Sequence, residues 1–104
     1  SARMVYVTQL VYVLEGREQQ FLEFEATVLP LLAKYRGELV LGLRPDPAAF
    51  VAGSAELPYE VHVVRFATDE DLAAYVDDGD RRRVLSLKDT SVRSSMTIRG
   101  TLVT

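Results

Sequence analysis

The sequence predicts a single α+β domain, residues 1–104, in which two helical segments cover one face of a four-stranded antiparallel sheet. Three observations lead to this prediction. The elements read in the order β-α-β-β-α-β, the first strand is apolar on both of its faces, and 48% of the 104 residues are hydrophobic. A chain of this length can bury one core but not two. The second apolar face of the first strand is therefore expected either to be covered by another molecule or to line a pocket.

The first strand, residues 4–14, shows no polar row. Its odd positions are Val5, Val7, Gln9, Val11 and Val13, and its even positions are Met4, Tyr6, Thr8, Leu10, Tyr12 and Leu14. Because successive side chains of a strand point to opposite faces, a strand with water on one side would alternate apolar and polar residues. We predict that the valine face packs on the helices, and that the other face meets a partner subunit or lines a pocket.

Residues 17–35 form the first predicted helical segment. Its apolar residues recur at helical spacing, namely Phe21, Phe24, Val28, Leu31, Leu32 and Tyr35. The charged residues Glu18, Glu23, Glu25 and Lys34 are assigned mostly to the opposite, solvent-facing side. Pro30 lacks a backbone donor, so it is expected to bend or interrupt the helix near residues 27–29. Gly37 is expected to end the segment as a left-handed C-cap.

The remaining elements follow from similar local signals. Residues 38–44 and 59–67 are predicted strands, and the Pro-, Ala-, Gly- and Ser-rich residues 45–58 between them are predicted to form a loop. Thr68 with Asp71 resembles a capping box that starts a second helix. Residues 77–80 interrupt that helix, and residues 81–87 continue as a short one. Residues 92–103 have the β-branched content of a last strand.

This order of elements is typical of the ferredoxin-like arrangement. Its helices cover one face of the sheet, so an apolar second face predicts a homodimer that packs its sheets face to face.

The chain resembles the dimeric α/β-barrel superfamily, and most closely a small bacterial family of uncharacterised proteins within it. The resemblance covers nearly the whole chain. It rests on the opening strand at residues 5–7, the helix end at residues 29–37 (Leu-Pro-Leu-Leu-Ala-Lys-Tyr-Arg-Gly), and the strand-to-helix passage at residues 63–70 (Val-Val-Arg-Phe-Ala-Thr-Asp-Glu). It implies a ferredoxin-like dimer. A likeness to the antibiotic-biosynthesis monooxygenases of the same superfamily implies enzymes that need no cofactor and remove a proton from an aromatic or carbonyl substrate in a dry pocket.

Two residues of the third strand are candidates for catalysis. His62 is the only histidine and the only group whose ordinary pKa lies near neutrality. The plainer interpretation is a hydrogen-bonded side chain at the edge of the core, and the functional one is a general base. Arg65 lies among valines, so it either reaches solvent at the strand end or faces a carboxylate, a ligand or a partner subunit. Their parity places them on opposite faces, so the two cannot act together from one subunit.

The first strand supplies the candidate ligand-binding residues. Tyr6, Thr8 and Tyr12 add hydroxyl groups to an apolar face, and Arg65 of the third strand is a fourth candidate. Apolar walls with a few polar groups suit a small organic ligand. The alternative is a dimer core in which each phenol binds a backbone carbonyl. Gln9, the lone polar residue of the valine face, is either a pocket group or the neighbour of a loop.

Composition argues against several other classes of function. There is no cysteine, the net charge is -3, and no apolar run approaches the about 20 residues of a membrane span. We therefore expect no metal site, cofactor, nucleic acid or membrane partner, and a cytoplasmic location. The basic run at residues 81–83 is expected to pair with nearby aspartates rather than with phosphate. The acidic run at residues 77–80 lacks the ligand spacing of a calcium loop.

Two functions remain. The first is a homodimeric small-molecule-binding or accessory protein, with its pocket either between sheet and helices or at the dimer centre. The second is a cofactor-independent enzyme of the monooxygenase, isomerase or lyase type, with His62 as base, Arg65 as anion stabiliser and Tyr12 as orienting group. A third interpretation is a dimer that binds no ligand and serves as an interaction module. The fold alone decides none of these, because one fold hosts many activities.

Overall fold

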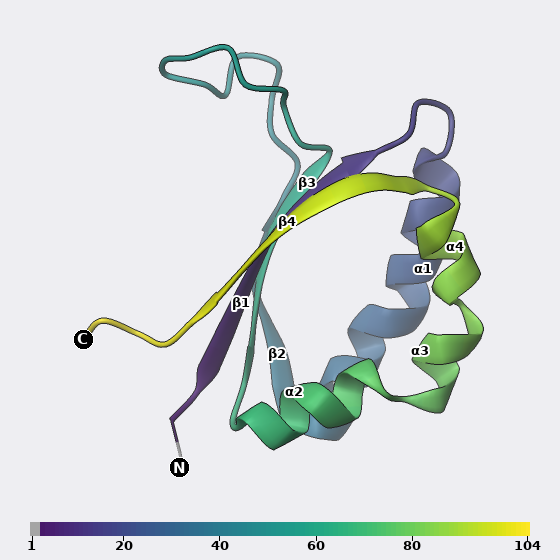
Figure 1. Ribbon diagram of the computed structural model, residues 1–104, viewed down its shortest axis with the longest axis vertical. Coiled ribbons are helices and arrows are strands. Elements are labelled where there is room, and N and C mark those ends of the chain that lie inside the picture. The colour runs from purple at the N-terminus through teal and green to yellow at the C-terminus, as the bar shows by residue number, and fades with distance from the viewer. Residues whose placement is uncertain (1–2) are drawn as a thin grey trace.

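The computed structural model of the chain describes residues 3–104. Its elements follow the predicted order (Figure 1). They are β1 (Val5–Val13), α1 (Glu18–Val28), the 3-10 helix η1 (Leu29–Tyr35), β2 (Gly37–Leu43), β3 (Glu60–Phe66), α2 (Asp69–Val76), α3 (Gly79–Arg83), α4 (Leu85–Asp89) and β4 (Val92–Gly100). The strands form one sheet in the order β2-β3-β1-β4, and every neighbouring pair is antiparallel. The ferredoxin-like α+β fold is therefore confirmed.

The core lies between the valine face of the sheet and the helices, which all lie on that side (Figure 1). Val5, Val7 and Val11 of β1 are buried, and Phe66 of β3 is fully buried. The helical side of the core comprises Phe21, Phe24, Val28 and Leu32. Burying a side chain of this size stabilises the fold by about 1.5–3 kcal/mol. The prediction that the valine face packs on the helices is confirmed.

The interruption of the first helical segment at Pro30 is also confirmed. The α-helix α1 ends at Val28, and the chain continues through Pro30 as the tighter helix η1. Proline lacks the N–H that an α-helix needs at this point, and its ring clashes with the carbonyl four residues earlier. The tighter helix carries the chain from α1 back to the sheet.

The predicted left-handed C-cap at Gly37 is wrong, because Arg36 takes that conformation with φ of +54°. Gly37 is instead the first residue of β2. A Cβ at Gly37 would lie 2.7 Å from Cε1 of Phe66 and 3.0 Å from the carbonyl oxygen of Leu32. Glycine at this position therefore allows a close approach to the core rather than a positive φ.

The second helical segment begins as predicted, since the Thr68 hydroxyl accepts a hydrogen bond from the backbone N–H of Asp71 at 3.1 Å. The interruption at residues 77–80 does more than break the helix, because the Asp78 side chain caps α3. The single short helix predicted for residues 81–87 is in fact two, α3 and α4. Arg82 and Arg83 form ion pairs with Asp77 and Asp80, as expected.

The last strand is shorter than predicted. It ends at Gly100, which pairs with Tyr6 near the start of β1, so few residues of β1 remain for further pairing.

The loop predicted at residues 45–58 is confirmed, and it extends away from the sheet between β2 and β3 (Figure 1). Among residues 3–104, no helix is long and apolar enough to cross a membrane.

The side of the sheet away from the helices is bare (Figure 1). The strand register gives it seven apolar side chains, which we call the outer face: Leu10, Leu41, Leu43, Val61, Val63, Met96 and Ile98. Met96 and Ile98 are 54% and 56% exposed. Large contiguous apolar patches on a protein surface commonly mark sites of interaction with another molecule.

Candidate functional site

A cavity of about 990 Å³ lies between the sheet and the helices. Most of its wall is apolar and includes Val7 and Val11 of β1 and Phe21, Phe24 and Val28 of α1. Polar side chains set into this wall include Gln9, Glu25 and His62. The lining also includes Asp69, Asp77, Arg81 and Lys88 of the helices, and the exposed residues Ser95, Thr97 and Arg99 of β4.

His62 is held in the cavity wall by a row of polar side chains that crosses three strands. Gln9 of β1 lies opposite His62 of β3 and opposite Thr97 of β4 in the strand register. Its amide Nε2 donates a hydrogen bond to Thr97 Oγ1 at 3.3 Å, and its Oε1 lies 2.8 Å from Nε2 of His62. With the amide in this orientation, Nε2 of His62 carries a hydrogen and donates it to Gln9. Nδ1 is left facing the helices.

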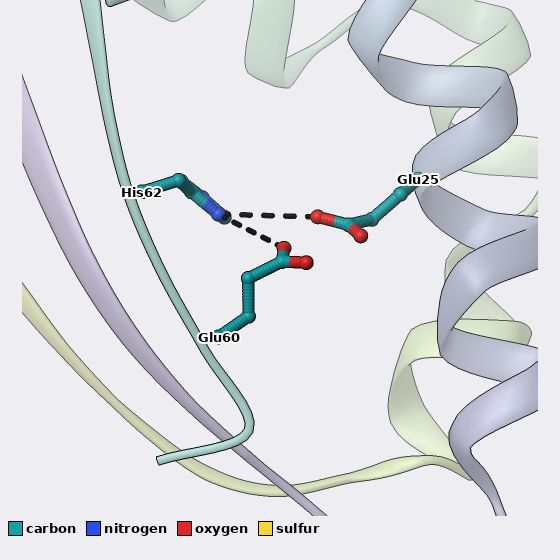
Figure 2. A group of neighbouring side chains, drawn as sticks. All are labelled: Glu25, Glu60 and His62. Atoms are coloured by element: carbon teal, nitrogen blue, oxygen red, sulfur yellow. Dashed lines mark hydrogen bonds and ion pairs between the residues drawn. The ribbon is translucent and has the colours of Figure 1, made fainter. Parts of the chain in front are cut away.

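Two carboxylates converge on Nδ1 of His62 (Figure 2). Glu60 lies two residues earlier on the same face of β3, and its Oε2 is 3.4 Å from Nδ1. Glu25 reaches across from α1, and its Oε2 is 3.9 Å from Nδ1. The three side chains are only 11–13% exposed. Arg44 donates a hydrogen bond at 3.2 Å to the other oxygen of Glu60, Oε1.

The two carboxylates titrate very differently. Burial, reinforced by a hydrogen bond to Glu60 and the negative charge of Glu60, raises the pKa of Glu25 to about 9. Burial also acts to raise the pKa of Glu60, but hydrogen bonds with His62 and Glu25, together with the charges of His62 and then Arg44, outweigh it and lower that pKa below its ordinary value. Two carboxylates this close resist joint ionisation, so near neutral pH the proton resides on Glu25.

Arg65, Tyr6 and Thr8 lie on the other side of the sheet. Arg65 donates hydrogen bonds to Oε2 of Glu38 at 2.6 and 3.0 Å and to the Tyr6 hydroxyl at 3.3 Å. The resulting environment raises the pKa of Arg65, through the hydrogen bond with Tyr6 first and that with Glu38 second. Thr8 lies between Val63 and Ile98 in the register. None of the three lines the large cavity, so their separation from His62 is confirmed and their ligand role stays a prediction.

Tyr12 lines a second, smaller cavity of about 330 Å³ at the base of the loop between β2 and β3. Arg44, Pro45 and Glu56 contribute to the same cavity. The guanidinium of Arg93 lies 5.6 Å from the Tyr12 ring and pairs with Glu56. Tyr12 is therefore separated from His62 as well.

The prediction that Glu25 lies on the solvent-facing side of its helix is wrong, because Glu25, taken as a whole residue, is only 9% exposed. Its neighbours in the helix carry the signal that would have placed it correctly. Phe21, Phe24, Glu25 and Val28 follow the spacing i, i+3, i+4, i+7 of a single buried stripe. A carboxylate inside an apolar stripe indicates that a polar partner is buried opposite it on the sheet. Glu60 and His62 of β3 are these partners.

Searches against known proteins support the fold and leave the activity open. No protein-family model matches the chain, and no curated protein matches it.

Solved structures do match. A protein of unknown function from Rhodopseudomonas palustris has a TM-score of 0.86 at 12% identity, over 100% of this chain and 85% of that one. A dimeric protein of unknown function with a ferredoxin-like fold, from Bacteroides fragilis, has a TM-score of 0.72 at 14% identity, over 95% and 96%. A dabb family protein with a ferredoxin-like fold, from Mesorhizobium loti, has a TM-score of 0.71 at 15% identity, over 98% and 99%. At such identities the likeness establishes the ferredoxin-like fold, and the likeness to monooxygenases stays a prediction.

Proposed function

We propose that the protein is a homodimer that binds a small, largely apolar organic compound in the cavity between its sheet and helices. The observation that carries this proposal is the cavity of about 990 Å³, with Gln9, Glu25 and His62 set into an apolar wall. Sites for small organic ligands commonly have volumes of about 300–1,000 Å³ and combine apolar walls with a few polar groups. The apolar area supplies affinity, and the three polar groups orient the compound.

The dimer is supported by the outer face. Its seven apolar side chains come from all four strands, and no element of the described chain covers them. A second copy of the same face would bury both sheets at once, in the closed two-fold geometry that most homodimers adopt. The related structure from Bacteroides fragilis is itself described as dimeric.

Binding in the cavity is tested with the fluorescent probe 1-anilinonaphthalene-8-sulfonate. Ser95 of β4 lines the cavity and is exposed, so Ser95→Trp would place a bulky side chain in the cavity without replacing a core residue. The matched control is Ser54→Trp, in the exposed loop between β2 and β3. We expect the wild-type protein and the control to bind the probe with equal affinity, and Ser95→Trp to bind it at least about tenfold more weakly, which corresponds to 1.4 kcal/mol. Equal affinity in all three proteins would refute binding in this cavity.

The dimer is tested by light scattering at micromolar concentration, where we expect twice the chain mass of 11.6 kDa. Ile98→Lys places a charge in the outer face, and Val51→Lys places the same charge on a fully exposed loop residue. We expect the first variant to be monomeric and the second to remain dimeric. A monomeric wild-type protein, or a dimeric Ile98→Lys variant, would show that the outer face does not hold two copies together.

The enzyme hypothesis receives less support from the geometry. It requires a base and an anion stabiliser in one cavity, whereas His62 and Arg65 lie on opposite faces of β3. One subunit therefore does not bring them to the same substrate. Binding is the function that this arrangement supports directly.

A further inference from the structure

We propose that Glu25, Glu60 and His62 form a binding site for one divalent transition-metal ion at the edge of the cavity, which Glu25 and His62 line. Each residue offers one donor atom, and the three donors lie within 4.8 Å of one another. They come from two elements, α1 and β3, that face each other across the cavity (Figure 2). This site shares Glu25 and His62 with the cavity proposed above to bind a compound, but a metal ion can bind there whether or not the compound does.

The distances between the donor atoms suit a shared ion. Nδ1 of His62 lies 3.4 Å from Oε2 of Glu60 and 3.9 Å from Oε2 of Glu25. Ligand bonds of about 2.0–2.2 Å, as zinc forms to nitrogen and oxygen, place neighbouring donors roughly 3–3.5 Å apart. The third pair of donors, from Glu25 and Glu60, also lies within 4.8 Å, so small side-chain movements would bring all three donors onto one ion.

The groups around the three donors are arranged as outer-shell partners of metal ligands usually are. A metal-binding histidine almost always donates its other ring N–H to an acceptor, which fixes the ring and exposes the remaining lone pair. Gln9 accepts from Nε2 of His62 and is itself fixed by its bond to Thr97, so Nδ1 points at the carboxylates. Arg44 occupies Oε1 of Glu60 and leaves Oε2 facing His62.

The charge of the site also favours a cation. Two carboxylates and a ring nitrogen converge in a space that is nearly closed to solvent, and the charged group bound to them is the half-exposed Arg44. Carboxylate ligands bind a metal in their deprotonated form, so a divalent ion would compensate both carboxylates at once.

The donor set indicates the class of ion. Imidazole nitrogen suits zinc, iron and nickel, and carboxylate oxygen suits manganese and magnesium, so a mixed set favours a divalent ion of the first transition row. Calcium prefers six to eight oxygen donors, which this site does not offer. Three protein ligands leave coordination positions open toward the cavity, where water or a polar atom of a bound compound would complete the shell.

The test uses untagged protein, stripped of metal with a chelator and then titrated with Zn²⁺ by calorimetry and with Co²⁺ by visible absorption. Glu25→Gln removes one donor while keeping the shape of the neutral side chain. Glu23→Gln, two residues earlier on the exposed side of α1, is the matched control. Circular dichroism checks that both variants fold.

We expect one Zn²⁺ per chain in the wild-type protein and in Glu23→Gln. We expect the Zn²⁺ affinity of Glu25→Gln to be at least about tenfold lower, because loss of an outer-shell partner alone already lowers metal affinity about 10- to 100-fold. Gln9→Leu, which removes such a partner, is expected to weaken binding about tenfold. Absence of stoichiometric binding in the wild-type protein, or equal affinity in Glu25→Gln, would overturn the proposal. Probe binding in the cavity would be unaffected by that failure, so the two proposals are tested separately.

Discussion

Replacement of Asp78 tests the most heavily bonded side chain between the helices. Its Oδ1 accepts backbone hydrogen bonds from Asp80 at 2.8 Å and Arg81 at 3.0 Å, and its Oδ2 accepts from the Tyr35 hydroxyl at 2.5 Å and from Lys34 Nζ at 3.2 Å. The side chain is only 2% exposed. The bond from Tyr35, followed by that from the backbone of Arg81, holds the pKa of Asp78 far below its ordinary value.

The magnitude follows from these four bonds. Loss of a helix N-cap costs about 1 kcal/mol, and loss of a charge-assisted bond from the Tyr35 hydroxyl costs about 1.5–3 kcal/mol. The ammonium of Lys34 adds little, because it is exposed and its charge is screened by water. Asp78→Ala is therefore expected to lower the free energy of unfolding by about 3 kcal/mol. Asp78→Asn keeps an oxygen for the cap and is expected to cost about half as much.

Urea unfolding at neutral pH, followed by circular dichroism, measures this difference. The neighbouring Asp77 is a suitable control because it is exposed and forms only a surface ion pair with Arg82. Asp77→Ala is expected to change the free energy of unfolding by less than about 0.5 kcal/mol. Equal effects of the two alanine substitutions would refute the reasoning that Asp78 joins η1 to α3.

Three further predictions follow from the described residues. Gly37→Ala is expected to cost about 1–3 kcal/mol, because its Cβ would clash with Phe66. Arg36→Gly relieves a positive φ but loses the exposed ion pair with Asp71, so it is expected to change the stability little. Thermal unfolding measures both variants, and a lower melting temperature for Arg36→Gly than for Gly37→Ala would contradict this prediction. Because the pKa of Asp78 is lowered in the folded state, its contribution to stability is present above its ordinary value of 3.8 and is lost as the pH falls below it. Acid unfolding curves of wild type and Asp78→Ala are expected to converge there. The pKa of Glu25 is raised from 4.5 to about 9, so the stability associated with its proton is present below pH 4.5 and is lost as the pH rises toward 9. In metal-free buffer, Glu25→Gln is expected to flatten this decline, and parallel curves would contradict the assignment.

Local signals in the sequence predicted the fold well. The absence of a polar row in β1 identified two apolar faces, and the valine face was assigned to the helices. Pro30 and Thr68 marked the end of α1 and the start of α2. These features depend on side-chain direction, backbone donors and caps within a few residues of each other. The residues that make such interactions are close together in the sequence, so a single sequence is enough to predict them.

The candidate site was predicted only in part. His62 was identified because it is the only histidine, but its partners come from Gln9, 53 residues earlier, and from Glu25 on a helix. The pairing of Gln9 with His62 depends on the register between β1 and β3, which no local pattern fixes. Glu25 was assigned to solvent on the basis of its charge, although its position in the apolar stripe placed it inside.

The sequence by itself determined the order of the elements, the two faces of the central strand and the residue types available for chemistry, because periodicity and capping act over short distances along the chain. Only the tertiary structure decided that His62 would meet two carboxylates in a cavity while Arg65 and Tyr6 bind each other on the opposite side of the sheet. The physical reason is that strand register and the distance between helix and sheet are set by packing of the whole core, and these two quantities determine which distant side chains touch.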